Sequence, residues 1–191
     1  MNVGGTAAVA AAFCVNSAKE SDIMRRKACL LAILATLCAA VPAGADESSF
    51  LKPLSGNWTG TGKVLRKIGG SPINVSCKFN ISTPGSSIAM KGNCRGLLVV
   101  NRPISADLTA RGTRYSGTYT GPSGASSQLS GSRKGDVISL AVHWARMVNG
   151  DRNANMTIRK PGNDQLTIQT IDRDLSSGKS IVTSDISLRR Q

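Results

Sequence analysis

The residue types that most often carry catalysis are sparse in this sequence. His143 is the single histidine, and the alternation of apolar residues around it places its side chain on the outward face of a strand. No cysteine or acid stands at ligand spacing from it, so the sequence predicts neither a metal site nor a cofactor. We therefore expect a protein that is not an enzyme. The alternative is a catalytic site assembled only in three dimensions, around Arg146, Arg152 or His143.

Acidic residues offer no clear catalytic pair. Asp172 and Asp174 are close in sequence, but they precede an expected turn, where aspartate commonly caps the backbone. A glycosidase needs two carboxylates that face one cleft, and no pattern in the sequence places two acids in that way. The acids therefore add no catalytic prediction.

Cys77 and Cys94 carry the one covalent feature that the sequence predicts. Apolar residues alternate through 73–81 and again through 88–94, and a turn sequence separates the two segments. A two-residue turn at 85–86 opposes the cysteines directly at a non-hydrogen-bonded position, where Cα atoms are about 4.5 Å apart. That separation lies within the range of disulfides. We predict a structural disulfide between them.

Large side chains on the expected inner faces form the candidate ligand-binding set. Its members are Trp58, Tyr115, Tyr119, Trp144 and Met147. They stand among glycines and alanines, and small residues on the inner face of a barrel leave room for one small apolar or aromatic molecule. Residues 144–148, at the end of a long strand, are the best candidate for the mouth of such a site. The alternative is a filled barrel in which these aromatics are simply core.

Many short strands must position these residues. From residue 54 onward, apolar and polar residues alternate between segments rich in Gly, Ser, Thr and Asn, with no heptads and no long helical period. We predict an all-β fold of eight to ten strands in an antiparallel up-and-down barrel, because closing such a meander removes its unpaired edges. A β-sandwich is the alternative. Turns are expected at residues 101–103, 111–113, 161–163 and 176–178.

Alternation predicts which residues face inward on the first and last strands. Residues 54–64 form the first strand, and alternation turns Trp58 and two glycines to its inner side. Val182 and Leu188 share the inner face of the last strand, and Arg190 continues that face.

The longest predicted hairpin turns at an Asn-Gly pair, residues 149–150. A strict two-residue turn there would mismatch the two faces, because Trp144 would lie opposite a polar residue. A three-residue loop at 148–150 with a left-handed glycine instead opposes Val142 to Met156. We predict the three-residue loop.

The chain begins with the three parts of a secretory signal peptide. Residues 24–27 are a basic cluster, residues 28–41 are an apolar run too short to span a bilayer comfortably, and an A-x-A site precedes Asp46. We therefore predict a signal peptide at 24–45 that is cleaved before Asp46. Any helix in this leader should lie outside the fold.

The remaining boundaries follow from the leader. Residues 1–23 are either a mis-assigned start, with Met24 as the true initiator, or an extended basic n-region. Residues 46–191 form a single barrel domain without a transmembrane segment, exported to the periplasm or the extracellular medium. Three of the five cysteines fall in the leader, and an even pair in an exported chain is typical of one disulfide.

The chain is strongly basic. Its formal net charge is +13, and removal of a leader with four basic and two acidic residues lowers it to +11. Such a charge attracts anionic envelope surfaces, acidic glycans or nucleic acid. Because the basic residues are spread along the chain, we expect a diffuse positive field and no specific nucleic-acid site.

Gly56-x-Trp58 on a first strand is similar to a motif of the calycin superfamily, which includes the lipocalins. In calycins a basic residue near the last strand packs over this tryptophan, and the resemblance gives that part to Arg190. It implies a lipocalin-like barrel. The sequence departs from the usual lipocalin pattern in showing no clear C-terminal helix and no second family motif.

A second resemblance covers more of the chain. The order of segment 54–60, Cys77, Cys94, segment 115–119 and segment 186–190 resembles small, uncharacterised exported proteins of rhizobia and related alphaproteobacteria. This resemblance implies a bacterial, exported setting. It brings no activity and no functional residues.

We therefore expect a non-enzymatic exported barrel that binds a small apolar or aromatic ligand. The alternative is a basic structural or surface-interaction protein of the cell envelope with a filled core. Salt separates the two, because adhesion through surface charge weakens as ionic strength rises and capture of an apolar ligand does not.

Overall fold

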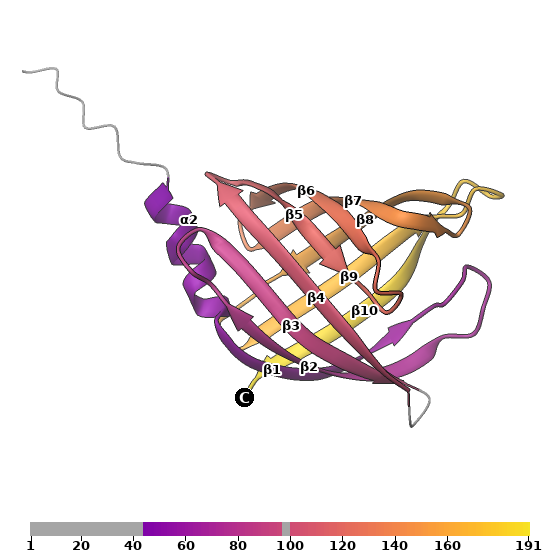
Figure 1. Cartoon of the computed structure of the whole chain (residues 1–191), viewed down its shortest axis with the longest axis horizontal. Coiled ribbons are helices and arrows are strands. Elements are labelled where there is room, and N and C mark those ends of the chain that lie inside the picture. Colours follow the sequence, from indigo (N-terminus) through magenta and orange to yellow (C-terminus); the bar gives the residue numbers. More distant parts are fainter. Residues whose placement is uncertain (1–43, 97–99) are drawn as a thin grey trace, which may run out of the picture. The chain divides into compact units, whose positions relative to one another are not determined.

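The computed structural model describes residues 44–96 and 100–191 as a short helical segment followed by ten strands (Figure 1). The helical segment consists of α2 (Gly44–Leu51) and a single 3₁₀ turn, η1 (Lys52–Leu54). The predictions for the leader before residue 44 lie outside the described residues. The sequence also predicts that the strand ladder continues through residues 97–100, and residues 97–99 of that segment lie outside the described residues.

The ten strands form a closed antiparallel barrel in which each strand pairs with its neighbours in sequence. In chain order they are β1 (Gly56–Val64), β2 (Ile73–Ser82), β3 (Ser87–Gly96), β4 (Val100–Arg111), β5 (Arg114–Thr120), β6 (Ser126–Lys134), β7 (Val137–Val148), β8 (Asp151–Arg159), β9 (Gln165–Arg173) and β10 (Ser180–Arg190). β1 also pairs with β10, which closes the ring. The predicted up-and-down barrel is confirmed, and its strand number is the upper limit of the predicted range.

The first and last strands meet as the calycin resemblance implies. Trp58 is 1% exposed, and its indole nitrogen donates a hydrogen bond to the carbonyl of Leu54 at 2.8 Å. The guanidinium carbon of Arg190 lies 4.6 Å from the centre of the Trp58 ring. Arg190 also donates hydrogen bonds to the carbonyls of Pro53 and Ser55. One side chain therefore fixes both the start of β1 and the end of β10.

The β2–β3 hairpin has the predicted register. Cys77 lies directly opposite Cys94, the Cα atoms are 4.0 Å apart, and the two sulfurs are bonded. Gly85 in the turn has a φ of 58°, in the left-handed region that glycine tolerates without strain. The turn prediction and the disulfide prediction are both confirmed.

The prediction for the β7–β8 turn is wrong. Val148 pairs directly with Asp151, so the turn has two residues, 149–150, with φ values of 51° and 100°. This turn alone would place Val142 opposite Thr157, but Val142 lies opposite Ala154, so the register changes between the turn and Val142. An Asn-Gly pair with positive φ at both positions matches the twist of the flanking strands.

A bulge in β7 resolves the mismatch of faces that the two-residue turn creates. The register shifts between His143 and Val148. The guanidinium of Arg152 donates to the carbonyls of Trp144 at 2.7 Å and Ala145 at 3.2 Å, which the bulge removes from the regular ladder. The extra residues bring Leu140 opposite Met156 and Val142 opposite Ala154, so the apolar faces of β7 and β8 match.

The expected turn at residues 101–103 is part of β4, and Pro103 lies opposite Asn93 of β3. β5 pairs with β4 only from Ser105 onward, so the proline stands where the strand has lost one neighbour. Proline is tolerated there because it has no N–H to donate to a ladder. The turns expected at 161–163 and 176–178 lie between strands, and the turn expected at 111–113 is formed by residues 112–113, because Arg111 is the last residue of β4.

Val182 does not share the inner face of β10. The register of β10 against β9 shifts between Val182 and Ser184, which leaves Val182 44% exposed and buries Thr183 in its place. Leu188 and Arg190 lie beyond the bulge and keep the predicted facing.

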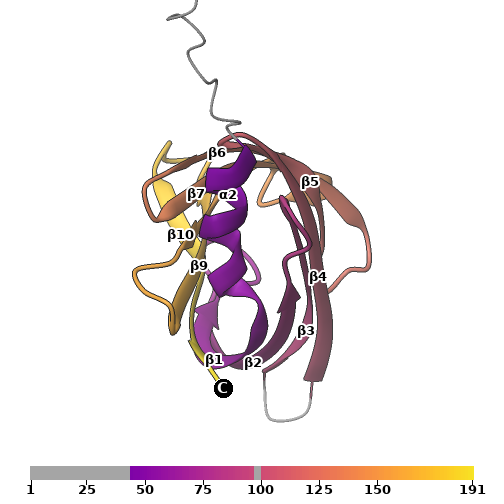
Figure 2. The ribbon, with the colours of Figure 1, turned by 90° about the vertical axis from the view of Figure 1, so that its left-hand side faces the viewer.

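The two ends of the barrel differ. α2 lies across one end, where Leu51 and Leu54 are fully buried (Figure 2). We call this the closed end. The opposite end is formed by the close of β1, β5, β7 and β9 and by the loops that follow them (Figure 1). We call it the open end, and it holds the candidate site.

Candidate functional site

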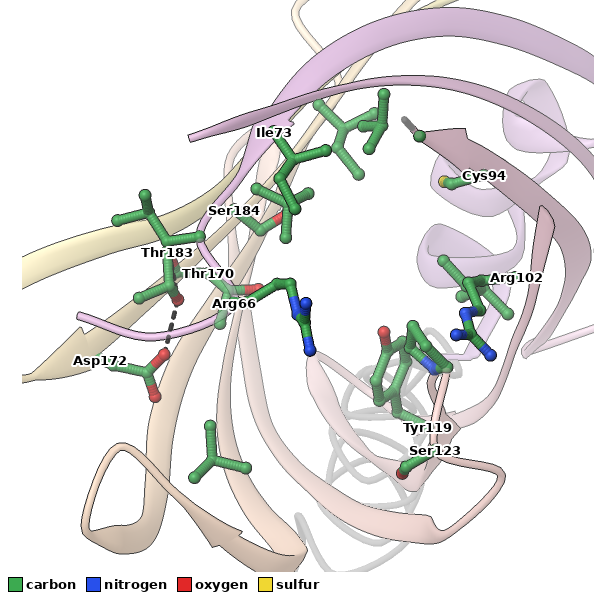
Figure 3. A pocket seen from close by; sticks show the side chains of 18 of the residues that line it. Arg66, Ile73, Cys94, Arg102, Tyr119, Ser123, Thr170, Asp172, Thr183 and Ser184 are labelled. Atoms are coloured by element: carbon green, nitrogen blue, oxygen red, sulfur yellow. Dashed lines mark hydrogen bonds between the residues drawn. The ribbon is translucent and has the colours of Figure 1, made fainter. Parts of the chain in front are cut away.

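A cavity of about 570 Å³ lies inside the open end of the barrel (Figure 3). Its apolar lining comes from opposite sides of the barrel and includes Ile73, Val75, Ile104, Tyr119, Trp144 and Ile186. A volume of this size is within the range of pockets that hold small organic ligands. Residues from β1 to β5, β7, β9 and β10 contribute to the lining, so only the closed barrel forms the cavity.

Two aromatic side chains form one wall. Tyr119 of β5 and Trp144 of the β7 bulge have ring centres 6.1 Å apart with planes inclined at 66°, an edge-to-face contact. Burial raises the pKa of Tyr119 to about 12. The phenol therefore stays protonated at neutral pH and can donate a hydrogen bond into the cavity.

Asp172 is the acid of the cavity, and its side chain is held by the wall. It is 4% exposed, and it accepts hydrogen bonds from Thr183 at 2.5 Å, Asn149 at 3.3 Å and the indole nitrogen of Trp144 at 3.4 Å. The last contact helps to orient the indole. The strand pattern of Leu166 and Ile168, extended by two more alternations, would have placed Asp172 on the inner face.

The neighbouring acid behaves as the sequence predicts. Asp174 accepts hydrogen bonds from Ser176 and Ser177 in the β9–β10 turn. These hydrogen bonds lower the pKa of Asp174, and the bond from the Ser177 side chain has the largest effect. The two aspartates therefore do different things, since Asp174 caps a turn and Asp172 faces the cavity.

Two arginines stand at the mouth. Arg66 follows β1, and Arg102 lies near the start of β4; both are exposed and both line the cavity. Arg102 is opposite Cys94, which faces inward, so Arg102 occupies an inner-face position. Neither arginine side chain forms an ion pair or hydrogen bond with any residue in 44–96 or 100–191. Figure 3 shows both side chains at the rim of the cavity.

The structure separates the sequence-predicted ligand set. Tyr119 and Trp144 line the cavity together. Trp58 and Tyr115 lie at the closed end and are 1% and 3% exposed, so they belong to the core. Met147 is outside the cavity lining and is 65% exposed.

Tyr115 belongs to a polar cluster that anchors α2. Its hydroxyl donates to the carboxylate of Glu47, which is 1% exposed and also forms an ion pair with Arg133 at 2.8 Å. Arg133 in turn lies 4.3 Å from the ring centre of Phe50. Sequence reasoning missed this cluster because Glu47 lies outside the strands, where alternation assigns no facing.

The cluster shifts two pKa values in opposite directions. Burial alone would raise the pKa of Glu47, but the hydrogen bonds from Arg133 and Tyr115 outweigh it and lower that pKa. Burial, and then the hydrogen bond to the Glu47 carboxylate, raise the pKa of Tyr115. Glu47 is therefore ionised and Tyr115 protonated over the physiological range.

The residues of the alternative catalytic site do not gather around the cavity. His143 is exposed on the outer face of β7, with Nδ1 3.3 Å from Oδ1 of Asn153. Arg152 is engaged with backbone carbonyls of the bulge. Within the described part of the chain no group of three or more His, Cys, Asp or Glu residues is arranged to hold a metal ion. None of the helices described in 44–96 and 100–191 has the length and apolar character needed to span a membrane.

No protein-family model and no curated protein sequence matches this chain. Among solved structures, Rv2717c from M. tuberculosis is similar, with a TM-score of 0.59 and 19% identity over 79% of this chain and 98% of that chain. The S-type phycobiliprotein lyase CPES from Guillardia theta is similar with a TM-score of 0.50 and 13% identity, over 78% of this chain and 97% of that chain. Both are lipocalin-like barrels, and at these identities the likeness is one of fold. The chain therefore has a calycin-like fold, a closed antiparallel up-and-down barrel of ten strands.

Proposed function

We propose that this protein is a non-enzymatic, exported barrel that binds one small apolar or aromatic molecule inside its open end. The observation that carries the proposal is the cavity of about 570 Å³, walled by Tyr119, Trp144 and aliphatic side chains. Transfer of apolar surface from water into such a cavity is favourable, at about 25 cal/mol per Å². The calycin-like fold supports the proposal, because closed barrels of this size hold single small ligands.

The asymmetry of the barrel supports binding at one end only. Glu47, Tyr115 and Arg133 hold α2 against the closed end through charge-assisted hydrogen bonds. That end is filled by core side chains such as Leu51 and Trp58. A ligand would therefore enter and leave between the loops of the open end.

A fluorescence titration tests the proposal. N-phenyl-1-naphthylamine is an uncharged aromatic probe that brightens in apolar surroundings, and we expect one molecule to bind per chain. Ile104→Trp adds bulk at a cavity wall and should weaken binding by about tenfold or more, a loss of about 1.4 kcal/mol. Native mass spectrometry of the purified protein should show the same one-to-one complex.

The matched control places the same bulk outside the barrel. Thr109 lies on β4, like Ile104, but its side chain is exposed. Thr109→Trp should leave probe binding unchanged, and circular dichroism checks that both variants keep their strands. If the probe does not brighten with the wild-type protein and no complex is seen by mass, the proposal is wrong.

One observation favours the second candidate, a protein that adheres to an anionic envelope surface. Between residues 48 and 106 the sequence has eight Lys or Arg residues and no Asp or Glu, and all eight are exposed. Four of them (Lys63, Lys78, Lys91 and Arg95) lie on β1, β2 and β3, which are adjacent in the barrel, so these four charges fall on one continuous sector. Adhesion through this sector should weaken steeply with salt, and binding of the uncharged probe should not.

A further inference from the structure

We infer that the ligand of this cavity is an amphiphile with a single anionic head group, held at the mouth by Arg66 and Arg102, and with its apolar part inside the barrel. This inference rests on the proposed function and adds the chemical class of the ligand. It follows from the charges at the mouth, from the place of both arginines in the cavity lining, and from the apolar character of much of the remaining wall.

Arg66 and Arg102 have free hydrogen-bonding capacity. Neither contributes to the ion pairs or side-chain hydrogen bonds formed among the described residues. A guanidinium presents a planar fork of N–H donors that matches the oxygens of a carboxylate, sulfonate or phosphate. Two such groups at one opening suit an organic anion better than a neutral ligand.

Both arginines line the cavity. Arg102 precedes Ile104 by two residues and lies opposite the inward-facing Cys94. Side chains on one face of a strand recur every second residue, so Arg102 shares the inner face of β4 with Ile104. Arg66 lies in the bend just beyond Val64, the last residue of β1, and lines the same cavity. Lys63, Lys78, Lys91 and Arg95 instead occupy outward-facing positions of β1, β2 and β3.

The charges of the lining add up to one positive charge. Among the described residues that line the cavity, Arg66, Arg102 and Asp172 are the charged ones. The Asp172 carboxylate already accepts three hydrogen bonds from wall residues. One carboxylate against two guanidinium groups leaves one positive charge for a ligand to neutralise, so a monoanion fits the mouth.

Tyr119 supplies a neutral donor close to this charge. In the view into the cavity, Tyr119 projects between the guanidinium groups of Arg66 and Arg102 (Figure 3). Burial keeps its phenol protonated, so it can donate to an anion and does not repel one. Much of the remaining lining is aliphatic and includes Val75 and Ile186. The head group therefore belongs at the mouth and the apolar part behind it.

A pair of probes with the same skeleton isolates the head group. 1-Anilinonaphthalene-8-sulfonate is the sulfonated form of N-phenyl-1-naphthylamine, and both brighten in apolar sites. We expect the sulfonate to bind about tenfold more tightly than the uncharged probe, a difference of about 1.4 kcal/mol. Its affinity should fall as salt is raised, while that of the uncharged probe should not. Dodecanoate should also displace the bound sulfonate more effectively than dodecanol, which shows that a carboxylate is accepted.

Removal of the two mouth charges should abolish this preference. The double variant Arg66→Gln, Arg102→Gln should bind both aromatic probes with similar affinity, because only the charged contact is lost. The control is Arg111→Gln with Arg114→Gln, which removes two exposed charges at the closed end. That control should keep the preference for the sulfonate.

The outcomes of these titrations distinguish a failure of the proposed function from a failure of the head-group inference. If neither probe binds, the proposed function fails and this inference fails with it. If both probes bind equally to the wild-type protein, or if the mouth variant keeps the preference, the head-group inference is wrong while the proposed function stands. If the closed-end variant loses the preference as well, net charge explains it and the inference is again wrong.

Discussion

Glu47 is the buried ionised residue whose partners tie α2 to the barrel. Its carboxylate receives hydrogen bonds from Tyr115 and from Arg133, which comes from the end of β6. Removing one partner of a buried ion pair leaves the other charge without compensation, which costs more than the pair contributes when intact. The position of α2 at the closed end therefore depends on one side chain.

We predict that Glu47→Gln lowers the free energy of unfolding at pH 7 by about 2 kcal/mol, because Arg133 loses its charge partner. The measurement is urea unfolding followed by circular dichroism. Asp164→Asn is the control, since Asp164 is 80% exposed in its pair with Arg190. An exposed pair should contribute at most about 1 kcal/mol.

The difference in the free energy of unfolding between wild type and Glu47→Gln should change with pH in a defined direction. The pKa of Glu47 is lowered in the folded state from an ordinary value of 4.5. Its stabilisation is therefore fully present above pH 4.5 and is lost as the pH falls through the folded-state pKa. The difference between wild type and Glu47→Gln should shrink over that acidic range. A difference that stays constant down to pH 3 would contradict the role given to this carboxylate.

At the residue scale, alternation was a good guide wherever a strand stayed regular. It placed Trp58 and Tyr119 inside, and the calycin resemblance paired Arg190 with Trp58. The same alternation of residues along β9 indicates that Asp172 faces inward, although Asp172 was interpreted only as a residue before a turn. Which inward residues lie at which end depends on strand register around the whole barrel, so the sequence grouped Tyr115 with Tyr119 although they lie at opposite ends.

At the scale of elements, the two predicted hairpins show what a local pattern can decide. The β2–β3 hairpin has regular alternation up to its turn, so the position of the turn gave the register that places Cys77 opposite Cys94. The β7–β8 hairpin has a bulge, which shifts the register of β7 against β8. The amino-acid composition of β7 does not indicate this shift. The carbonyls that the bulge exposes are satisfied by Arg152 from the partner strand. That compensation becomes visible only in three dimensions.

The disulfide gives a test at this scale. Cys77 and Cys94 are separated by 17 residues, and the loop closed by such a bond limits its stabilisation to about 3 kcal/mol. We predict that Cys77→Ala with Cys94→Ala lowers the free energy of unfolding by about 2–3 kcal/mol while probe binding persists, because the strand register does not need the bond. Urea unfolding of the variant should match that of the reduced wild-type protein. An unchanged unfolding midpoint would contradict the prediction.

At the scale of the whole molecule, the fold class was predictable and the cavity was not. Ten short amphipathic strands joined by tight turns leave few arrangements that hide every edge, so the closed barrel followed from the pattern. The size of the cavity depends on how side chains from eight strands fill the interior. No local sequence pattern reveals how much of the interior these side chains fill together. The sequence therefore left a ligand cavity and a filled core as alternatives.

The export prediction also belongs to the whole molecule. Expression of the full gene with its own leader should give an exported protein whose mass begins at Asp46 and is two hydrogens below that of the reduced chain. Ala45→Arg should block the cleavage, because a small residue is required at the A-x-A site. A reduced, uncleaved chain retained inside the cell would contradict both the leader and its boundary.

Pairing of β1 with β10 has a consequence for the time course of folding. Arg190 contacts the carbonyl of Ser55, 135 residues earlier in the chain. Contacts so distant in sequence carry a high entropic cost before they form, and proteins dominated by them fold slowly. Until β10 has left the ribosome, β1 and β9 each keep an unpaired edge. The nascent chain therefore cannot complete its barrel during synthesis, and it remains open to chaperones, or to a translocation channel, until its last strand is available.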